Sequence, residues 1–229
     1  MSESPRSGSA ALFHVEHCDA SAQEAQRQKV VAYFDFDAET SHDLDRYAQL
    51  LRDWQLRMNL VSKSTLANIW QRHFADSAQL VSLATASPAS VWLDLGSGAG
   101  FPGLILARCS VGEFHLVEAT RKKAEFLAAA VATLGVCNRV TIHNERIEAL
   151  RPFDADYITA RACAPLSRLF AWGLPFARNA TWLLLKGRLV DLEIVAAREH
   201  FSFDCQRVAS ITEPSATIII ARNVRRLRA

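Results

Sequence analysis

The chain reads Asp94-Leu-Gly-Ser-Gly-Ala-Gly-Phe-Pro-Gly103 directly after the short apolar stretch Val91-Trp92-Leu93. This order of residues predicts a buried strand, a tight turn through glycines and a helix that begins near Phe101. Glycine tolerates positive φ and lets a ligand approach the backbone closely, while a helix N-terminus offers free N–H groups. The sequence therefore predicts a cofactor-binding loop at the end of a central strand.

The glycines of this loop fit two cofactor patterns. Gly98-x-Gly100-x-x-Gly103 satisfies the dinucleotide pattern, whereas Asp94-x-Gly96-x-Gly98-x-Gly100 resembles the first motif of S-adenosylmethionine (AdoMet) methyltransferases. The Asp94 carboxylate would repel a pyrophosphate and would attract the cationic methionine end of AdoMet. We therefore favour AdoMet over a dinucleotide or a glycine turn without a ligand. A Walker-type phosphate loop is excluded, because no Lys-Ser or Lys-Thr pair follows the glycines.

A second carboxylate follows the glycines at the distance expected of a ribose-binding residue. The mostly apolar stretch Phe114-His-Leu-Val-Glu118 predicts a short strand that ends about twenty residues after the loop. Glu118 could accept two hydrogen bonds from the vicinal hydroxyl groups of a ribose, or it could simply begin a helix in solvent. Together with Asp94, it predicts the second half of a cofactor pocket.

Composition and charge narrow the class of protein. Half of the 229 residues are hydrophobic, yet no apolar run approaches the roughly 20 residues of a membrane span, and no signal peptide is evident. We therefore expect a cytoplasmic protein without a membrane partner. The five cysteines are widely spaced and contain no CxxC pair, so we expect neither a disulfide framework nor a metal site.

The formal net charge of +2 means that any contact with nucleic acid must come from local basic patches. One cluster precedes the glycine loop and another lies in the last eight residues; they comprise Arg52, Arg57, Lys63 and Arg72, and Arg222, Arg225, Arg226 and Arg228. For the second cluster, solvated charge on a frayed tail is an equal alternative.

Strand and helix patterns alternate from Val91 onward and predict an α/β fold with a doubly wound, mostly parallel seven-stranded sheet. A hairpin around Glu213-Pro214 predicts a reversed edge strand, as in class I AdoMet-dependent methyltransferases, whose ligands bind beyond the carboxyl ends of the strands. The expected strands lie near 90–95, 114–118, 140–143, 156–160, 181–186, 202–208 and 216–222, and the helices near 101–109, 120–134, 166–177 and 188–199.

The chain divides into three predicted parts. Residues 1–40 should form a flexible N-terminal extension that is partly helical, with one helix around 21–34. Residues 41–85 should form a helical element packed on the main domain, with helices over 42–58, capped by Ser41, and over 66–83. Residues 86–229 should form the AdoMet-binding methyltransferase domain.

Several motifs between residues 41 and 222 resemble, in order, those of the glucose-inhibited division protein B family. They are Asn59-Leu60, Arg72-His73-Phe-Ala-Asp76-Ser77, Gly96-Ser-Gly-Ala-Gly-Phe-Pro-Gly103, Arg121-Lys-Lys-Ala-Glu-Phe-Leu127, Arg146-Ile147-Glu148, Arg161-Ala162 and Lys186-Gly187. Members of this family are bacterial methyltransferases that modify ring nitrogen 7 of a guanine in small-subunit (16S) ribosomal RNA. The resemblance implies an AdoMet-dependent enzyme that acts on 16S RNA or on the small ribosomal subunit, and we expect a monomer.

The resemblance also implies roles for single residues. In the cofactor pocket, the loop residues would contact AdoMet, Ile147 and Glu148 would flank its adenine, and Arg161 would reach it from a strand end. Asn59, Arg72, His73 and Lys186 would bind RNA or, with Asp76, shape the mouth of the pocket, and Arg161 and Lys186 are the candidates for positioning the reactants. The complete cofactor set is Asp94, Gly96, Gly98, Gly100, Phe101, Glu118, Ile147, Glu148 and Arg161.

The implied chemistry needs no catalytic side chain. Ring nitrogen 7 of guanine carries a lone pair and no proton, so in-line methyl transfer to it requires alignment of the reactants but no general base. Two departures from the family pattern are the extra leading residues and Ser215-Ala216, where the family often has a basic residue. The alternatives are a methyltransferase for another RNA, a small molecule or a protein, and an AdoMet- or RNA-binding module without turnover.

Overall fold

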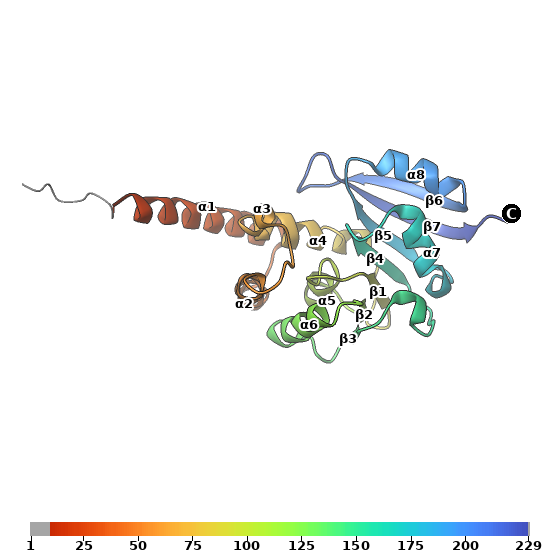
Figure 1. The fold of residues 1–229 in the computed structure, drawn as a ribbon, viewed down its shortest axis with the longest axis horizontal. Helices are drawn as coiled ribbons and strands as arrows, with labels where there is room; N and C mark the ends of the chain where they lie inside the picture. The colour runs from red at the N-terminus through yellow and green to blue at the C-terminus, as the bar shows by residue number, and fades with distance from the viewer. Residues whose placement is uncertain (1–9, 229) are drawn as a thin grey trace, which may run out of the picture.

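The computed structural model describes residues 10–228, and a seven-stranded sheet forms its centre (Figure 1). The strand order is β3-β2-β1-β4-β5-β7-β6; β7 runs antiparallel to both β5 and β6, and the other pairs are parallel. The predicted fold class is therefore confirmed. The strands are β1 (Val91–Leu95), β2 (Glu113–Val117), β3 (Val140–His143), β4 (Tyr157–Arg161), β5 (Thr181–Lys186), β6 (Phe201–Ala209) and β7 (Thr217–Arg226).

Helices cover both faces of the sheet, so neighbouring strand residues enter different halves of the core. On β1, Trp92 packs in the cluster that contains the helices after β1 and β2, whereas Leu93 packs in the cluster that contains the helices after β4 and β5. Strands buried on both faces explain the nearly continuous apolar runs in the sequence. These helices are α5 (Gly103–Cys109), α6 (Arg121–Thr133), α7 (Leu166–Gly173) and α8 (Val190–Arg198).

Each strand and helix predicted after residue 90 is present, with small shifts at the ends. The predicted helix 166–177 ends as α7 at Gly173 and continues as the short 3-10 turn η4 (Leu174–Phe176), where Pro175 interrupts the regular helix. The last strand continues beyond residue 222 to Arg226, because its outer end pairs with the start of β6.

The N-terminal helices begin earlier than predicted. α1 (Ala10–Phe34) starts before the predicted residue 21, and the first nine residues of the expected extension lie outside the described part. α2 (Ala38–Gln55) is capped by Asp37, whose carboxylate accepts the Thr40 N–H at 2.7 Å. The prediction of Ser41 as the cap is therefore wrong: Asp37 supplies the capping oxygen one turn earlier, and Ser41 is buried within the helix.

The predicted single helix over 66–83 is replaced by four short turns. They are α3 (Lys63–Leu66), the π-helical turn η1 (Trp70–Ala75), α4 (Asp76–Ala78) and the 3-10 turn η2 (Val81–Leu83). The Ser77 hydroxyl donates to the His73 carbonyl at 2.7 Å, a side-chain bond that competes with the regular helical pattern. Trp70 and Phe74 from this stretch are buried in the core.

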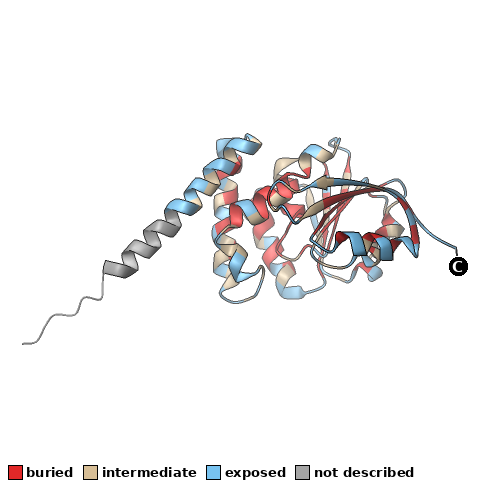
Figure 2. Ribbon diagram, turned by 90° about the horizontal axis from the view of Figure 1, so that it is seen from above, coloured by how far each residue is buried: buried red, intermediate tan, exposed pale blue. Residues whose placement is uncertain are grey.

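The buried residues lie along the sheet and on the helix faces that meet it (Figure 2). Because β1, β2, β4 and β5 are parallel, their carboxyl ends meet at one edge of the sheet. The turns η1 and α4 and the β6–β7 connection approach this edge and contact each other, since Thr212 donates to Asp76 at 2.7 Å. Among the described helices, none is both long and apolar enough for a membrane crossing.

Candidate active site

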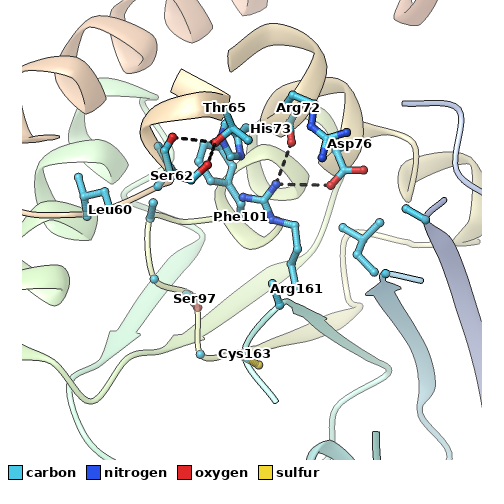
Figure 3. Close-up of a pocket in the computed structure, with 18 of the residues that line it drawn as sticks. Leu60, Ser62, Thr65, Arg72, His73, Asp76, Ser97, Phe101, Arg161 and Cys163 are labelled. Atoms are coloured by element: carbon cyan, nitrogen blue, oxygen red, sulfur yellow. Dashed lines mark hydrogen bonds and ion pairs between the residues drawn. The ribbon is translucent and has the colours of Figure 1, made fainter. Parts of the chain in front are cut away.

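A cavity of about 990 Å³ lies at the carboxyl ends of the strands (Figure 3). Five parts of the chain line it: the glycine loop after β1, the segment from Leu60 to Asp76, the stretch from Glu118 to Lys123 after β2, the ends of β4 and β5, and the β6–β7 connection. Its volume is at the upper end of the range of small-molecule pockets, roughly 300–1,000 Å³. The space is sufficient for a cofactor and part of a second reactant.

The glycine loop is fixed by hydrogen bonds to its backbone. The Ser97 N–H donates to the Val117 carbonyl at 3.0 Å, and the Tyr47 hydroxyl on α2 donates to the Ala99 carbonyl. Gly100 has a φ of +82°, and a Cβ atom there would lie 2.4 Å from Leu104 Cδ1 and 2.7 Å from the Tyr47 hydroxyl oxygen. Only glycine fits this position without a shift of the loop or of its neighbours.

Glu118 lines the cavity and supports the loop at the same time. One carboxylate oxygen accepts the Gly98 N–H at 3.0 Å, and the other accepts the Thr120 N–H at 2.7 Å. The side chain is nearly buried, with the residue 7% exposed. Each carboxylate oxygen has further lone-pair capacity, so the predicted contact with a ribose stays compatible with this arrangement.

Asp94 lies beneath the loop and does not line the cavity. It is 2% exposed and accepts the Thr159 hydroxyl at 2.7 Å, and a Cβ atom at Gly103 would lie 2.8 Å from its carboxylate. Burial raises the pKa of this carboxyl to about 6. The strand end predicted by sequence is correct, but any attraction for a cationic ligand acts across the loop backbone instead of by direct contact.

The opposite wall of the cavity is centred on Arg161, at the end of β4. Its guanidinium carbon lies 4.7 Å from the centre of the Phe101 ring, and one of its nitrogens donates to the Arg72 carbonyl at 3.1 Å and to Asp76 at 3.4 Å (Figure 3). Burial lowers the pKa of Arg161, and Asp76 opposes this effect. Arg161 thereby joins the loop residue Phe101 to the N-terminal helical turns.

His73 is buried beside Phe101, the ring that Arg161 also contacts. Its ring stacks on Phe101 with 4.9 Å between centroids, and Nε2 lies 3.0 Å from the Thr65 hydroxyl. Burial lowers the pKa of His73 to about 3, and the positive charges of Arg161 and Arg72 act in the same direction. His73 is therefore a neutral, packed side chain at neutral pH.

Two further cations at the cavity are held by carboxylates. Arg72 pairs with Glu213 of the β6–β7 connection, and each of these side chains is 35% exposed. Lys186, at the end of β5, pairs with Glu193 and donates to the Ala164 carbonyl at 2.9 Å; its side chain is 6% exposed. Arg72 is therefore the more accessible of the two to a large anionic ligand.

The structure brings most of the predicted residues together around the cavity. Those that line it are Gly96, Gly98, Phe101, Glu118, Arg161, Arg72, His73, Asp76 and Lys186. Asp94 and Gly100 support the loop from behind, and three further predicted residues lie outside the cavity wall: Ile147 is buried in the core, while Glu148 and Asn59 are exposed. Contacts of these three with cofactor or RNA stay predictions.

Sequence reasoning missed three residues that build the site. Tyr47 lies within the predicted helix 42–58, and its hydroxyl holds the loop. The pattern around Glu213 indicates only a turn, and Cys163 is one of the five widely spaced cysteines. The Cys163 thiol donates to the Leu95 carbonyl at 3.2 Å, and burial raises its pKa to about 11. No local sequence signal marks these contacts, because each joins distant segments.

Solved structures show the same fold. An O-methyltransferase from Bacillus cereus, in complex with SAH, superposes with a TM-score of 0.55 over 78% of this chain and 91% of that chain, at 16% sequence identity. A chain of the fibrillarin/Nop5p complex gives 0.52 over 66% and 81%, at 13% identity. At such low identities these similarities establish the fold alone.

The comparisons of sequence are more specific. The protein named ribosomal RNA small subunit methyltransferase G from Rhodospirillum rubrum is 45% identical over 182 residues, which cover 79% of this chain and 89% of that protein. The protein of that name from Paramagnetospirillum magneticum is 42% identical over 192 residues, or 83% and 92% of the two chains. A family model described as GidB, rRNA small subunit methyltransferase G, matches residues 40–223. The chain therefore belongs to the rRNA small subunit methyltransferase G (GidB) family.

Proposed function

We propose that this protein transfers a methyl group from AdoMet to ring nitrogen 7 of a guanine in 16S RNA of the small ribosomal subunit. The transfer would be a direct in-line displacement without a general base. Membership of the family and the methyltransferase fold support the reaction class. The geometry of the cavity supports the type of acceptor.

The residues at the cavity fit AdoMet. The backbone of Gly96 is exposed at the loop, where no side chain would obstruct a ligand, and Glu118 presents carboxylate oxygens beside it. Phe101 and Arg161 close the pocket on the side of the N-terminal turns. When bound, AdoMet supplies an electrophilic methyl group on its sulfonium sulfur. These residues would hold and orient it, and Asp94 would support the loop from below.

The proposal depends on one observation: the titratable side chains that line the cavity in the described part of the chain include no free base. Among the described lining residues, every carboxylate is engaged: Asp76 by Arg161, Glu213 by Arg72, and Glu118 by two backbone N–H groups. His73 has its pKa lowered to about 3, so it is a poor base at neutral pH. An acceptor that carries no proton, such as guanine nitrogen 7, matches this wall, whereas an exocyclic amine would need a base.

The basic side chains at the cavity mouth suit RNA phosphates. Arg72 and Arg188 line the cavity, and Arg188 is exposed, so a phosphate could approach both. Positively charged side chains should contact RNA phosphates and not the reacting edge of the base, because the methylated base becomes cationic. Since duplex RNA hides its major-groove edges, the target guanine should lie in a loop or a distorted region.

The test is a nucleoside profile of 16S RNA from a strain that lacks this gene. One 7-methylguanosine should disappear from the mass spectrum and return when the gene is restored. The purified protein should also transfer labelled methyl groups from AdoMet to small subunits of the deletion strain. An unchanged nucleoside profile would refute the RNA substrate, and methylation of an exocyclic amine instead would refute the argument from the missing base.

A further inference from the structure

A second basic surface lies at the far end of the β6–β7 hairpin, away from the cofactor cavity. A cavity of about 600 Å³ there is lined by residues of α7, the start of β6 and the end of β7. It shares no lining residue with the first cavity. We define the C-terminal basic surface by its exposed arginines, which are Arg168, Arg198, Arg225, Arg226 and Arg228.

Three of these guanidinium groups lie over aromatic rings. Arg168 lies 5.4 Å from the Trp172 centroid, and Arg226 lies 5.6 Å from that of Phe201. Similarly, Arg198 lies 4.8 Å from the ring of Phe203. A stacked guanidinium group loses side-chain freedom but keeps its N–H edge free, so it is ordered in advance for a planar or tetrahedral anion.

These arginines also lack the acidic partners that neutralise others. Within the described part of the chain, the ion pairs involve none of the five residues of this surface. Glu199 is the acidic residue among those that line the second cavity. Asp204, on the neighbouring strand, instead accepts the side-chain amide of Asn223 at 2.6 Å. The positive charge of the surface is therefore available to a ligand.

The hairpin fixes the distance between the two basic sites. Thr217 at the start of β7 pairs with Lys186 at the cofactor cavity, and Arg226 at its end pairs with Phe201. Nine residue steps at about 3.3 Å each separate the two ends by about 30 Å. β7 ends on the side of the molecule opposite α1 (Figure 1).

We propose that the C-terminal basic surface binds the phosphate backbone of the substrate RNA about 30 Å from the reacting base. This inference rests on the proposed function. Phosphates fit better than bases, because Phe201 and Phe203 are only 3% and 7% exposed, and Arg168 lies over the ring of the partly buried Trp172. Simultaneous contact at both sites needs an RNA whose backbone reaches at least about 30 Å from the target guanine.

The experiment compares two double variants with the same change in net charge. Arg168→Glu/Arg226→Glu alters the C-terminal basic surface, and Arg46→Glu/Arg151→Glu alters exposed arginines elsewhere. Binding to small subunits from the deletion strain is measured by filter binding at several salt concentrations. We expect the first variant to bind about tenfold more weakly, with a flatter dependence of log K on log salt, and the second to bind as the wild type does.

Calorimetric titration with AdoMet and thermal unfolding show whether both variants keep the fold and the cofactor site. If both double variants weaken binding to small subunits equally, the effect comes from net charge and not from this surface, and the proposal is wrong. If the first variant binds as the wild type does, the proposal is also overturned. A third outcome would assign the surface to a membrane and would also overturn the proposal. In that case anionic phospholipid vesicles capture the wild type but not the first variant, and the two proteins bind small subunits equally. Failure of the wild type to methylate small subunits would instead refute the proposed function.

Discussion

The two walls of the cofactor cavity are built in different ways. The loop wall depends on backbone contacts: Ser97 and Gly98 donate to neighbouring groups, and Ala99 accepts from Tyr47. The opposite wall depends on charged side chains, with Arg161 bound to Asp76 and Arg72 bound to Glu213. Backbone hydrogen bonds and buried contacts hold the first wall, whereas ion pairs between side chains hold the second.

This difference separates the tasks of the two walls. A loop whose backbone positions are determined in advance suits a cofactor of constant shape. Partly exposed ion pairs contribute little to stability and are screened by salt, so a polyanion can replace one carboxylate without unfolding the wall. The Arg72–Glu213 pair, with both side chains 35% exposed, is the contact that RNA can exchange most easily.

Replacement of Gly100 with alanine should disrupt the loop wall most strongly. A Cβ atom would combine a strained φ of +82° with a 2.4 Å approach to Leu104. We expect a loss of about 3 kcal/mol in the free energy of unfolding. AdoMet affinity should also fall about tenfold or more, because the loop must move. Urea unfolding and calorimetric titration measure the two effects.

Gly135→Ala provides the matched control. Gly135 has a similar φ of +67°, but a Cβ atom there would meet no other atom within 4 Å. This variant should show only the cost of backbone strain, about 1 kcal/mol, and unchanged AdoMet affinity. Equal losses in both variants would mean that the close contacts behind Gly100 do not determine the loop.

Replacement of Asp76 with alanine should disrupt the opposite wall. Arg161 would lose its carboxylate partner while its side chain, 16% exposed, stays largely buried. We expect a loss of about 2 kcal/mol in the free energy of unfolding, less than the roughly 3–5 kcal/mol of fully buried pairs. Asp154→Ala, which breaks the exposed pair with Arg178, should cost less than about 0.5 kcal/mol. If chemical denaturation shows no difference between the two variants, the wall does not depend on this ion pair.

The same difference explains how much of the site could be predicted from the sequence. The loop wall is local: the glycines, the apolar strand before them and Glu118 at the next strand end form one recognisable pattern, and the alternation of elements predicted the sheet. The predicted position of Arg161 at the end of β4 also agrees with the structure.

The opposite wall could not be predicted in the same way. Arg72 and Glu213 are 141 positions apart, and their contact depends on how the hairpin folds back over the N-terminal turns. Asp94 shows a second limit: its place at a strand end was correct, but the pattern does not say on which side of the loop a carboxylate lies. Ser41 failed as a cap because a competing capping residue, Asp37, precedes it.

Replacement of Tyr47 with phenylalanine tests the joint between the N-terminal helices and the loop wall. The residue is fully buried, and loss of its hydroxyl would leave the Ala99 carbonyl without this donor. We expect about 1.5 kcal/mol lower stability and a several-fold weaker affinity for AdoMet. Tyr33→Phe, at a residue 68% exposed, should change neither quantity. Wild-type affinity in the Tyr47 variant would show that the loop keeps its shape without this hydrogen bond from α2.

The smallest expected effect concerns the pH dependence of the opposite wall. The folded-state pKa of His73 is about 3 because of burial and two nearby arginines, whereas an unfolded histidine titrates near 6.5. Above about pH 6.5, His73 is neutral in both the folded and the unfolded protein. Below this pH, the imidazole binds a proton in the unfolded protein but not in the folded one, so the stability of the fold decreases as the pH falls toward 3. We therefore expect wild-type stability to fall about 1 kcal/mol more than that of His73→Gln between pH 7 and pH 5.5. The exposed His42→Gln variant serves as the control. If urea unfolding of the wild type and of His73→Gln changes in parallel with pH, His73 is not held neutral by this wall.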